Sequence, residues 1–134
     1  MEGPPCPGIH PVLSRLFIYT SLAYSALMRF VETPVFTRRI TDLLSDDAYT
    51  RLQRDLLRNP RAGKVIQGTG GLRKLRWGDE SKQRGKRGGL RIIYYWYFSE
   101  EVFYMLLAFS KNDQEDLTQD QKRALRRLVE QEFK

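Results

Sequence analysis

Lysines and arginines are concentrated in one stretch of the chain, between residues 61 and 91. The stretch holds ten basic residues against two acidic ones, a local charge of +8, whereas the whole 134-residue chain carries +7. Cations gathered in this way most often meet a phosphate backbone, whose negative charges they neutralise. The concentration therefore predicts a surface that binds a polyanion. A solvated basic loop without a partner is the alternative.

The chain contains one cysteine, Cys6, and one histidine, His10. This composition excludes an intrachain disulfide, a metal site built from several cysteines or histidines, and an acid–base pair of two histidines. The candidates for chemistry in the basic stretch are therefore its lysines and arginines.

Three predicted strands position these cations. Runs rich in apolar and β-branched residues predict strands at 72–77, 90–98 and 102–109. A polar, basic loop at 78–89 joins the first two strands. The tight connection at 99–101 indicates that the last two form a hairpin.

Strand alternation is expected to place three of the cations on one face of the sheet. Successive side chains point to opposite faces, so Lys74 and Arg76 share one face of their strand. If helices cover the other face, which carries Leu75, these two cations and Arg91 project from the open face. Burying a cation inside an apolar strand is costly unless its head group reaches solvent or a partner. The alternative interpretation of Arg91 is an arginine at a strand end whose head group only reaches solvent. Lys111, the first cation after the third strand, would close the same patch unless it is an ordinary turn lysine.

The rest of the chain predicts helices around this sheet. A short strand at 28–32 precedes a helix near 35–44, and Ser45 is a favourable N-cap for a second helix that ends near Pro60. Thr118 opens a final helix with a capping box. This order predicts an α+β fold, a small antiparallel sheet with the N-terminal helices packed on one face and a C-terminal helix. The predicted core residues are Tyr49, Leu52, Leu56, Leu75, Ile92, Tyr94, Trp96, Leu125 and Leu128.

Residues 1–27 differ in composition from the rest of the chain. Four of the six prolines lie among the first eleven residues, which disfavours helix and strand there. The apolar run at 16–27 is shorter than the roughly 20 residues that a membrane-spanning helix needs. We therefore divide the chain into an extension, 1–27, which is disordered or read from upstream of a true start at Met28, and a domain, 28–134. A signal peptide is the other interpretation of the extension.

Three blocks of the domain resemble one known family. They are Val65 to Arg76 (VIQGTGGLRKLR), Gly85 to Tyr95 (GKRGGLRIIYY) and Ser110 to Thr118 (SKNDQEDLT). Taken in this order, they are similar to the HigB-type toxins, which belong to the RelE/ParE superfamily of bacterial toxin–antitoxin modules. The similarity extends from about Met28 to the C-terminus.

The resemblance implies both a fold and an activity. The fold would be the RelE-like microbial RNase fold. The activity would be that of a type II toxin, a cytoplasmic endoribonuclease that inhibits translation by cleaving mRNA in the ribosomal A site without a metal or other cofactor. The implied partners are the ribosome, its mRNA and a HigA-like antitoxin with a helix-turn-helix domain, and no membrane.

The resemblance also assigns site residues. The family's catalytic positions fall on four cations, Lys74, Arg76, Arg91 and Lys111. The sequence departs from some relatives at Asn112, where an additional arginine can stand. It also has Leu117 and Thr118 in the segment leading into the last helix, where those relatives have a tyrosine. The domain has no histidine, which some relatives use. The identity of the general acid and general base is therefore left open.

These residue types suit cleavage of RNA by its own 2′-hydroxyl group. Arg91 would hold the scissile phosphate through paired hydrogen bonds, and Arg76 would share its charge. Lys74 or Lys111 would act as acid or base. Tyr95 would stack on a base or donate a proton, unless it is only a partly exposed aromatic of the sheet. The cations expected to bind RNA or the ribosome without reacting are Arg73, Lys82, Arg84, Lys86 and Arg87.

Two other functions are compatible with the same features. A gyrase inhibitor of the ParE type would have the same fold and would cause DNA damage while leaving mRNA intact. A non-catalytic relative would dock on RNA or on an acidic protein. The cationic open face and the HigB-like blocks favour the endoribonuclease.

Overall fold

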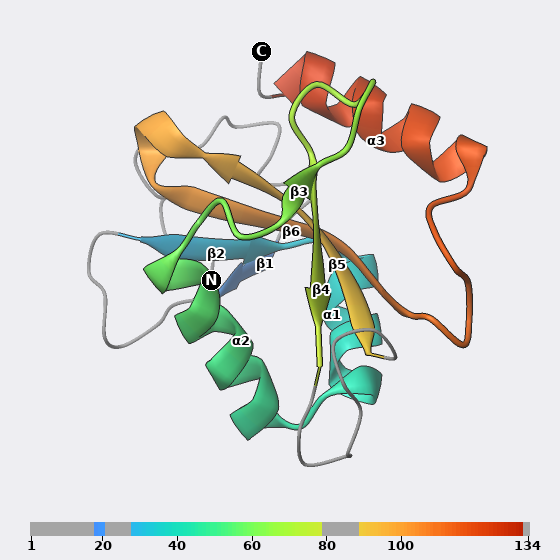
Figure 1. Ribbon diagram of the computed structural model, residues 1–134. Coiled ribbons are helices and arrows are strands. Elements are labelled where there is room, and N and C mark those ends of the chain that lie inside the picture. The colour runs from blue at the N-terminus through green and yellow to red at the C-terminus, as the bar shows by residue number, and fades with distance from the viewer. Residues whose placement is uncertain (1–17, 21–27, 79–88, 133–134) are drawn as a thin grey trace.

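The computed structural model describes residues 18–20, 28–78 and 89–132 (Figure 1). Within these residues, one six-stranded sheet carries three α-helices and a short 3-10 helix, so the α+β prediction is confirmed. The elements in chain order are β1 (Ile18–Thr20), β2 (Arg29–Glu32), α1 (Pro34–Leu43), α2 (Asp46–Arg58), β3 (Lys64–Val65), β4 (Arg73–Trp77), β5 (Leu90–Tyr97), η3 (Phe98–Glu100), β6 (Val102–Ser110) and α3 (Gln119–Glu132).

The sheet has the strand order β1-β2-β6-β5-β4-β3. β5 and β6 form the predicted hairpin, and β4 pairs antiparallel with β5. β2 and β6 are parallel, which differs from the all-antiparallel sheet expected from the sequence. The two strands are separated by two helices and three strands, so no local sequence signal marks their pairing.

The helices lie on both faces of the sheet (Figure 1). α1 and α2 cover one face, where Ile40 and Leu52 join a core cluster with Ile92 of β5. α3 covers part of the opposite face, where Val129 packs with Ile93. Of the core residues predicted from the sequence, Leu52, Leu56, Ile92 and Tyr94 belong to the first cluster. The others are partly buried and pack against one of the two clusters: Tyr49, Leu75, Trp96, Leu125 and Leu128. The face that carries the predicted cations is therefore open only beyond the area that α3 covers.

Helices α2 and α3 each follow a residue whose side chain caps the free backbone N–H groups of the first turn. Ser45 accepts a hydrogen bond from the Ala48 N–H at 3.1 Å, which confirms it as the N-cap of α2. Thr118 accepts from the Gln121 N–H at 3.1 Å, and the Gln121 side chain accepts from the Thr118 N–H at 3.0 Å. This reciprocal pair is the predicted capping box, and it fixes where α3 leaves the segment that follows β6.

A buried carboxylate ties the N-terminal helices to the sheet. Glu32 of β2 is 3% exposed, and its side chain accepts hydrogen bonds from the hydroxyl groups of Thr37 in α1 and Tyr49 in α2. Burial and the adjacent Glu32 carboxylate raise the pKa of Tyr49 above its ordinary value. The Tyr49 hydroxyl therefore keeps its proton above the pH at which a free tyrosine loses it, and it continues to donate to Glu32 there.

We expect Tyr49→Phe to lower the free energy of unfolding by about 1–3 kcal/mol, because it removes a hydrogen bond from a buried carboxylate. Urea denaturation monitored by circular dichroism measures the change. Adding Glu32→Gln to the same protein should cost less than the sum of the two single changes, because both remove one interaction. An unchanged unfolding midpoint in Tyr49→Phe would show that the hydrogen bond adds no net stability.

Candidate functional site

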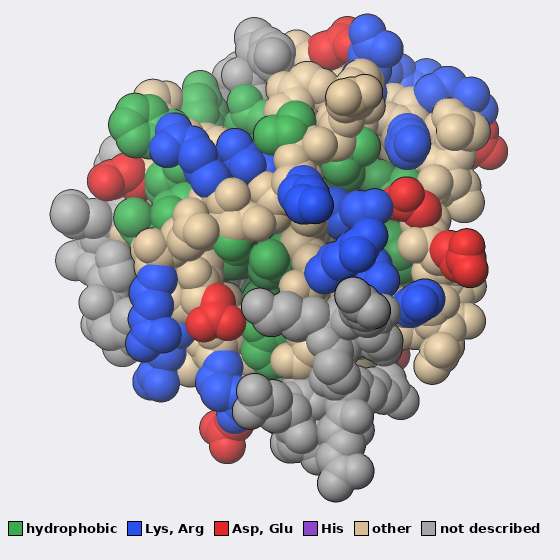
Figure 2. All heavy atoms as spheres, in the orientation of Figure 1, with side chains coloured by type: hydrophobic (Ala, Val, Ile, Leu, Met, Phe, Trp, Pro, Cys, Tyr) green, Lys and Arg blue, Asp and Glu red, His purple; other side chains and the backbone are tan. Residues whose placement is uncertain are grey.

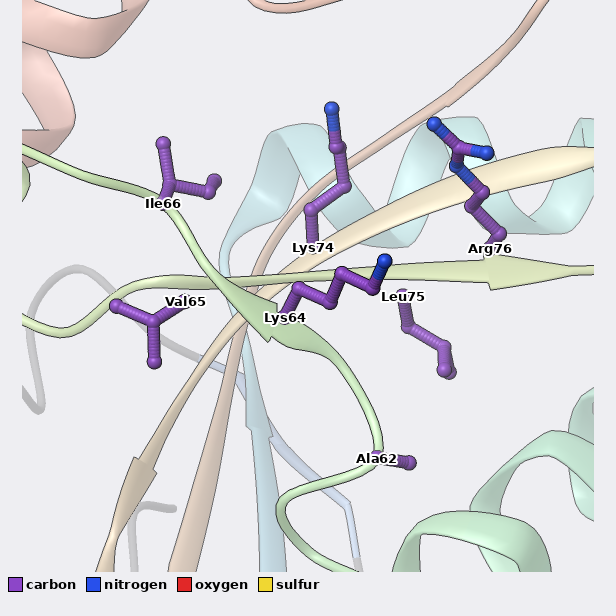
Figure 3. Close-up of a pocket in the computed structure, with 7 residues that line it drawn as sticks. All are labelled: Ala62, Lys64, Val65, Ile66, Lys74, Leu75 and Arg76. Atoms are coloured by element: carbon purple, nitrogen blue, oxygen red, sulfur yellow. The ribbon is translucent and has the colours of Figure 1, made fainter.

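The register of β4 and β5 brings three of the predicted site residues to one face. Arg76 lies directly opposite Arg91, and Lys74 lies opposite Ile93. Figure 3 shows Lys74 and Arg76 on one side of β4 and Leu75 on the other. Leu75 packs with the cluster beneath α1 and α2, as strand alternation predicts. We call Lys74, Arg76 and Arg91 the cationic cluster.

The two arginines of the cationic cluster differ in burial. Arg91 is 5% exposed, whereas Arg76 is exposed. Burial and the neighbouring Arg76 lower the pKa of Arg91 below its ordinary value, and Asp116 opposes this effect. Like charges directly opposite each other in a sheet repel, so the pair is favourable only with an anion nearby. The arrangement is therefore suited to bind a phosphate group.

Asp116 supplies such an anion within the chain itself. Its Oδ1 atom lies 3.1 Å from the Lys74 ammonium nitrogen and accepts the Leu117 N–H at 2.8 Å. Partial burial acts to raise the pKa of Asp116, but the bonds from Leu117 and Lys74 hold it below its ordinary value. Sequence reasoning missed Asp116, because 42 residues separate it from Lys74 and no local pattern links the two.

Lys111, the fourth predicted catalytic residue, lies at the end of the sheet. It follows β6 directly, one position beyond the Leu90–Ser110 pair, and its N–H donates to the Gly89 carbonyl at 3.4 Å. Its side chain is exposed. Arg91 is one residue further along β5, so both cations belong to the same end of the sheet.

The structure does not bring Arg73 to the cationic cluster. Arg73 lies opposite Tyr94 on the other face of the sheet, and its guanidinium donates to the carbonyls of Gly63 at 2.8 Å and Arg61 at 3.4 Å. These bonds hold the connection between α2 and β3. Strand alternation alone separates Arg73 from its neighbour Lys74.

Tyr95 also lies away from the cationic cluster. It shares a face with Arg91, but the fully buried Ile93 stands between them. A Cβ atom added at Gly71 would lie 3.2 Å from the Tyr95 ring, so this turn packs against the ring, which is half-buried. Tyr95 also makes an edge contact with Tyr97 at a centroid distance of 6.2 Å. Of the remaining predicted RNA-binding residues, Lys82, Arg84, Lys86 and Arg87 lie outside the described residues.

A hollow of about 440 Å³ adjoins the cationic cluster (Figure 3). Lys74 and Arg76 line it, together with Lys64, which pairs with Lys74 across β3 and β4. Sequence reasoning counted Lys64 in the basic stretch but gave it no role. Figure 2 shows basic side chains gathered near the middle of one face, beside acidic ones. The other residues that line the hollow are Ala62, Val65, Ile66 and Leu75.

The described segments contain neither a candidate metal site nor a candidate membrane span. Residues 18–20, 28–78 and 89–132 bring together no three histidine, cysteine or acidic side chains that could hold a metal ion. No helix in these segments is long and apolar enough to cross a membrane. No family model matches the chain.

Proposed function

We propose that this protein is the toxin of a type II toxin–antitoxin system and inhibits translation by cleaving mRNA in the ribosomal A site. The observation that carries the proposal is the position of Arg76 directly across from Arg91, with Lys74 on the same face. Three cations on adjacent strands, beside a hollow, match the charge of an RNA phosphate and its neighbours. The resemblance of three sequence blocks to HigB-type toxins supports the same function.

The cationic cluster suits attack of a 2′-hydroxyl on the adjacent phosphate. The phosphorane that forms carries two negative charges, and two guanidinium groups can each donate paired hydrogen bonds to its oxygens. Lys74 donates a hydrogen bond to Asp116, and the same donor could bind a phosphate oxygen or supply a proton once RNA is bound. Lys111 is the other candidate for proton transfer. No metal or cofactor takes part in this proposal.

The proposal includes three partners and a compartment. The ribosome presents the mRNA and supplies part of the geometry, because the cationic cluster offers few groups for acid–base catalysis. We therefore expect naked RNA to be cleaved slowly or not at all. A HigA-like antitoxin with a helix-turn-helix domain would neutralise the toxin. Action on ribosomes places the protein in the cytoplasm.

Expression of the full chain in bacteria without the antitoxin tests this function. We expect protein synthesis to stop and primer extension to reveal new 5′ ends within translated messages, because cleavage requires the ribosome. Blocking translation initiation on a reporter mRNA should protect that message. Intact messages together with gyrase cleavage complexes would favour the ParE-type alternative. Intact messages with bound RNA would favour a non-catalytic binding protein.

A further inference from the structure

Asp116 occupies a place that a binding site for RNA would be expected to keep free of negative charge. Its carboxylate reaches the cationic cluster from the segment between β6 and α3 and pairs with Lys74 at 3.1 Å. The Lys74 side chain is 21% exposed and that of Asp116 52% exposed, so incoming anions can reach both. Asp116 is therefore paired with Lys74, the side chain that the proposed function assigns to an RNA phosphate.

The backbone around Asp116 fixes its carboxylate in this position. The Leu117 N–H donates to Oδ1 at 2.8 Å, and the side chain of Gln114 donates to the Asp116 carbonyl at 2.9 Å. The capping box at Thr118 begins two residues later and anchors the segment to α3. Asp116 is thus held against Lys74 by the fold, and the pair does not depend on two freely rotating side chains.

We propose that Asp116 is an internal counter-anion of the cationic cluster that competes with RNA phosphate for Lys74. RNA binding then requires the Lys74–Asp116 ion pair to break. This inference rests on the proposed function, since it takes the cationic cluster to be the RNA-binding site. The cost of breaking this ion pair lowers the affinity for RNA, because the polyanion must first displace a carboxylate that the backbone holds in place.

Asp116→Asn tests the proposal through binding of a short single-stranded RNA oligonucleotide, measured by fluorescence anisotropy. Asparagine retains the oxygen that accepts the Leu117 N–H and removes only the charge. We expect affinity to rise by about fivefold, the upper end for an ion pair of this exposure. The slope of log K against log salt concentration should steepen by roughly 0.7, as expected for one additional phosphate contact with a single strand.

Glu115→Gln is the matched control, because it removes the same charge one residue away on an exposed side chain. It should change affinity by less than twofold. Equal effects of Asp116→Asn and Glu115→Gln, or weaker binding by Asp116→Asn, would overturn the proposal. Thermal unfolding of both variants shows whether the segment before α3 is intact. If Asp116→Asn is unstable, Asp116→Ser measured with the same control takes its place.

A double variant identifies Lys74 as the partner through which Asp116 acts. Asp116→Asn should increase affinity less in a Lys74→Gln background than in the wild type, and an equal increase would overturn the proposal. The same series separates this inference from the proposed function. If Lys74→Gln and Arg76→Gln weaken RNA binding while Asp116→Asn matches Glu115→Gln, only the role of Asp116 is wrong. If neither cation matters for binding, the cationic cluster is not the RNA site and both proposals fail.

Discussion

Arg76→Gln is expected to lower the rate of ribosome-dependent mRNA cleavage by roughly 100- to 1,000-fold. In the proposed mechanism, the substitution removes one of two guanidinium groups that would face the scissile phosphate, whose negative charge would be greatest in the transition state. Loss of one such donor typically costs about 2.7–4 kcal/mol of transition-state stabilisation. Because Arg76 is exposed, its replacement should leave the fold intact. Primer extension on a reporter mRNA incubated with purified ribosomes measures the rate.

Arg127→Gln is the control for the loss of one positive charge. Arg127 lies on the exposed side of α3, and its replacement should change cleavage by less than threefold if the effect belongs to the cationic cluster. Arg91→Gln should be at least as damaging as Arg76→Gln, but Arg91 is 5% exposed, so its thermal unfolding must be measured alongside. Undiminished cleavage by a folded Arg76→Gln protein would contradict the assignment of the phosphate to this face.

The kinetic form of the defect distinguishes catalysis from binding. If Arg76 acts mainly on the transition state, the maximal rate at saturating ribosome concentration falls and the half-saturating concentration changes little. If Arg76 only attracts RNA, the half-saturating concentration rises and the maximal rate is retained. We expect the first result, because the proposed function assigns Arg76, which lies directly opposite Arg91, to the phosphate on which negative charge develops.

Local sequence patterns predicted β2, β4, β5 and β6 and the faces of the cationic cluster, but not β1, which lies within the N-terminal extension. Alternation along β4 correctly separates Lys74 and Arg76 from Leu75, because strand geometry fixes the period at two residues. Ser45 and Thr118 correctly mark the starts of α2 and α3, because capping depends on residues within one turn. These features have in common that their physical cause lies within a few residues of the chain.

The features that the sequence did not predict depend on contacts between distant segments. The parallel pairing of β2 with β6 and the packing of α3 on the second face are set by the whole chain. Tyr95 lies on the predicted face, yet the turn at Gly71 packs against its ring. Asp116 enters the cationic cluster from a segment that reads as an ordinary polar connection. The face of the sheet on which a side chain lies could therefore be inferred from the sequence. The distant segments that contact that face could not.

Phe103→Ala is expected to lower the free energy of unfolding by about 3–5 kcal/mol, the largest stability change predicted for this protein. Phe103 is fully buried in β6, beneath α1 and α2. Its ring stacks on Phe30 of β2 at a centroid distance of 4.6 Å and lies 4.4 Å from the ring of Trp96 in β5. Alanine would remove contacts to both neighbouring strands and leave a cavity that the rigid sheet cannot close.

Phe98→Ala provides the matched control in urea denaturation of the two variants. Phe98 is 67% exposed, and its main described contact is the Arg61 guanidinium, 5.6 Å from the ring centroid. Its loss should cost no more than about 1 kcal/mol. Similar costs for the two phenylalanines would show that the β6 core contributes little to stability. A domain of this size has roughly 5–15 kcal/mol of stability in total, so Phe103→Ala should remove a large fraction of it. Because β6 joins β2 to β5, which carries Arg91, the same variant should also lose cleavage at temperatures where Phe98→Ala remains active.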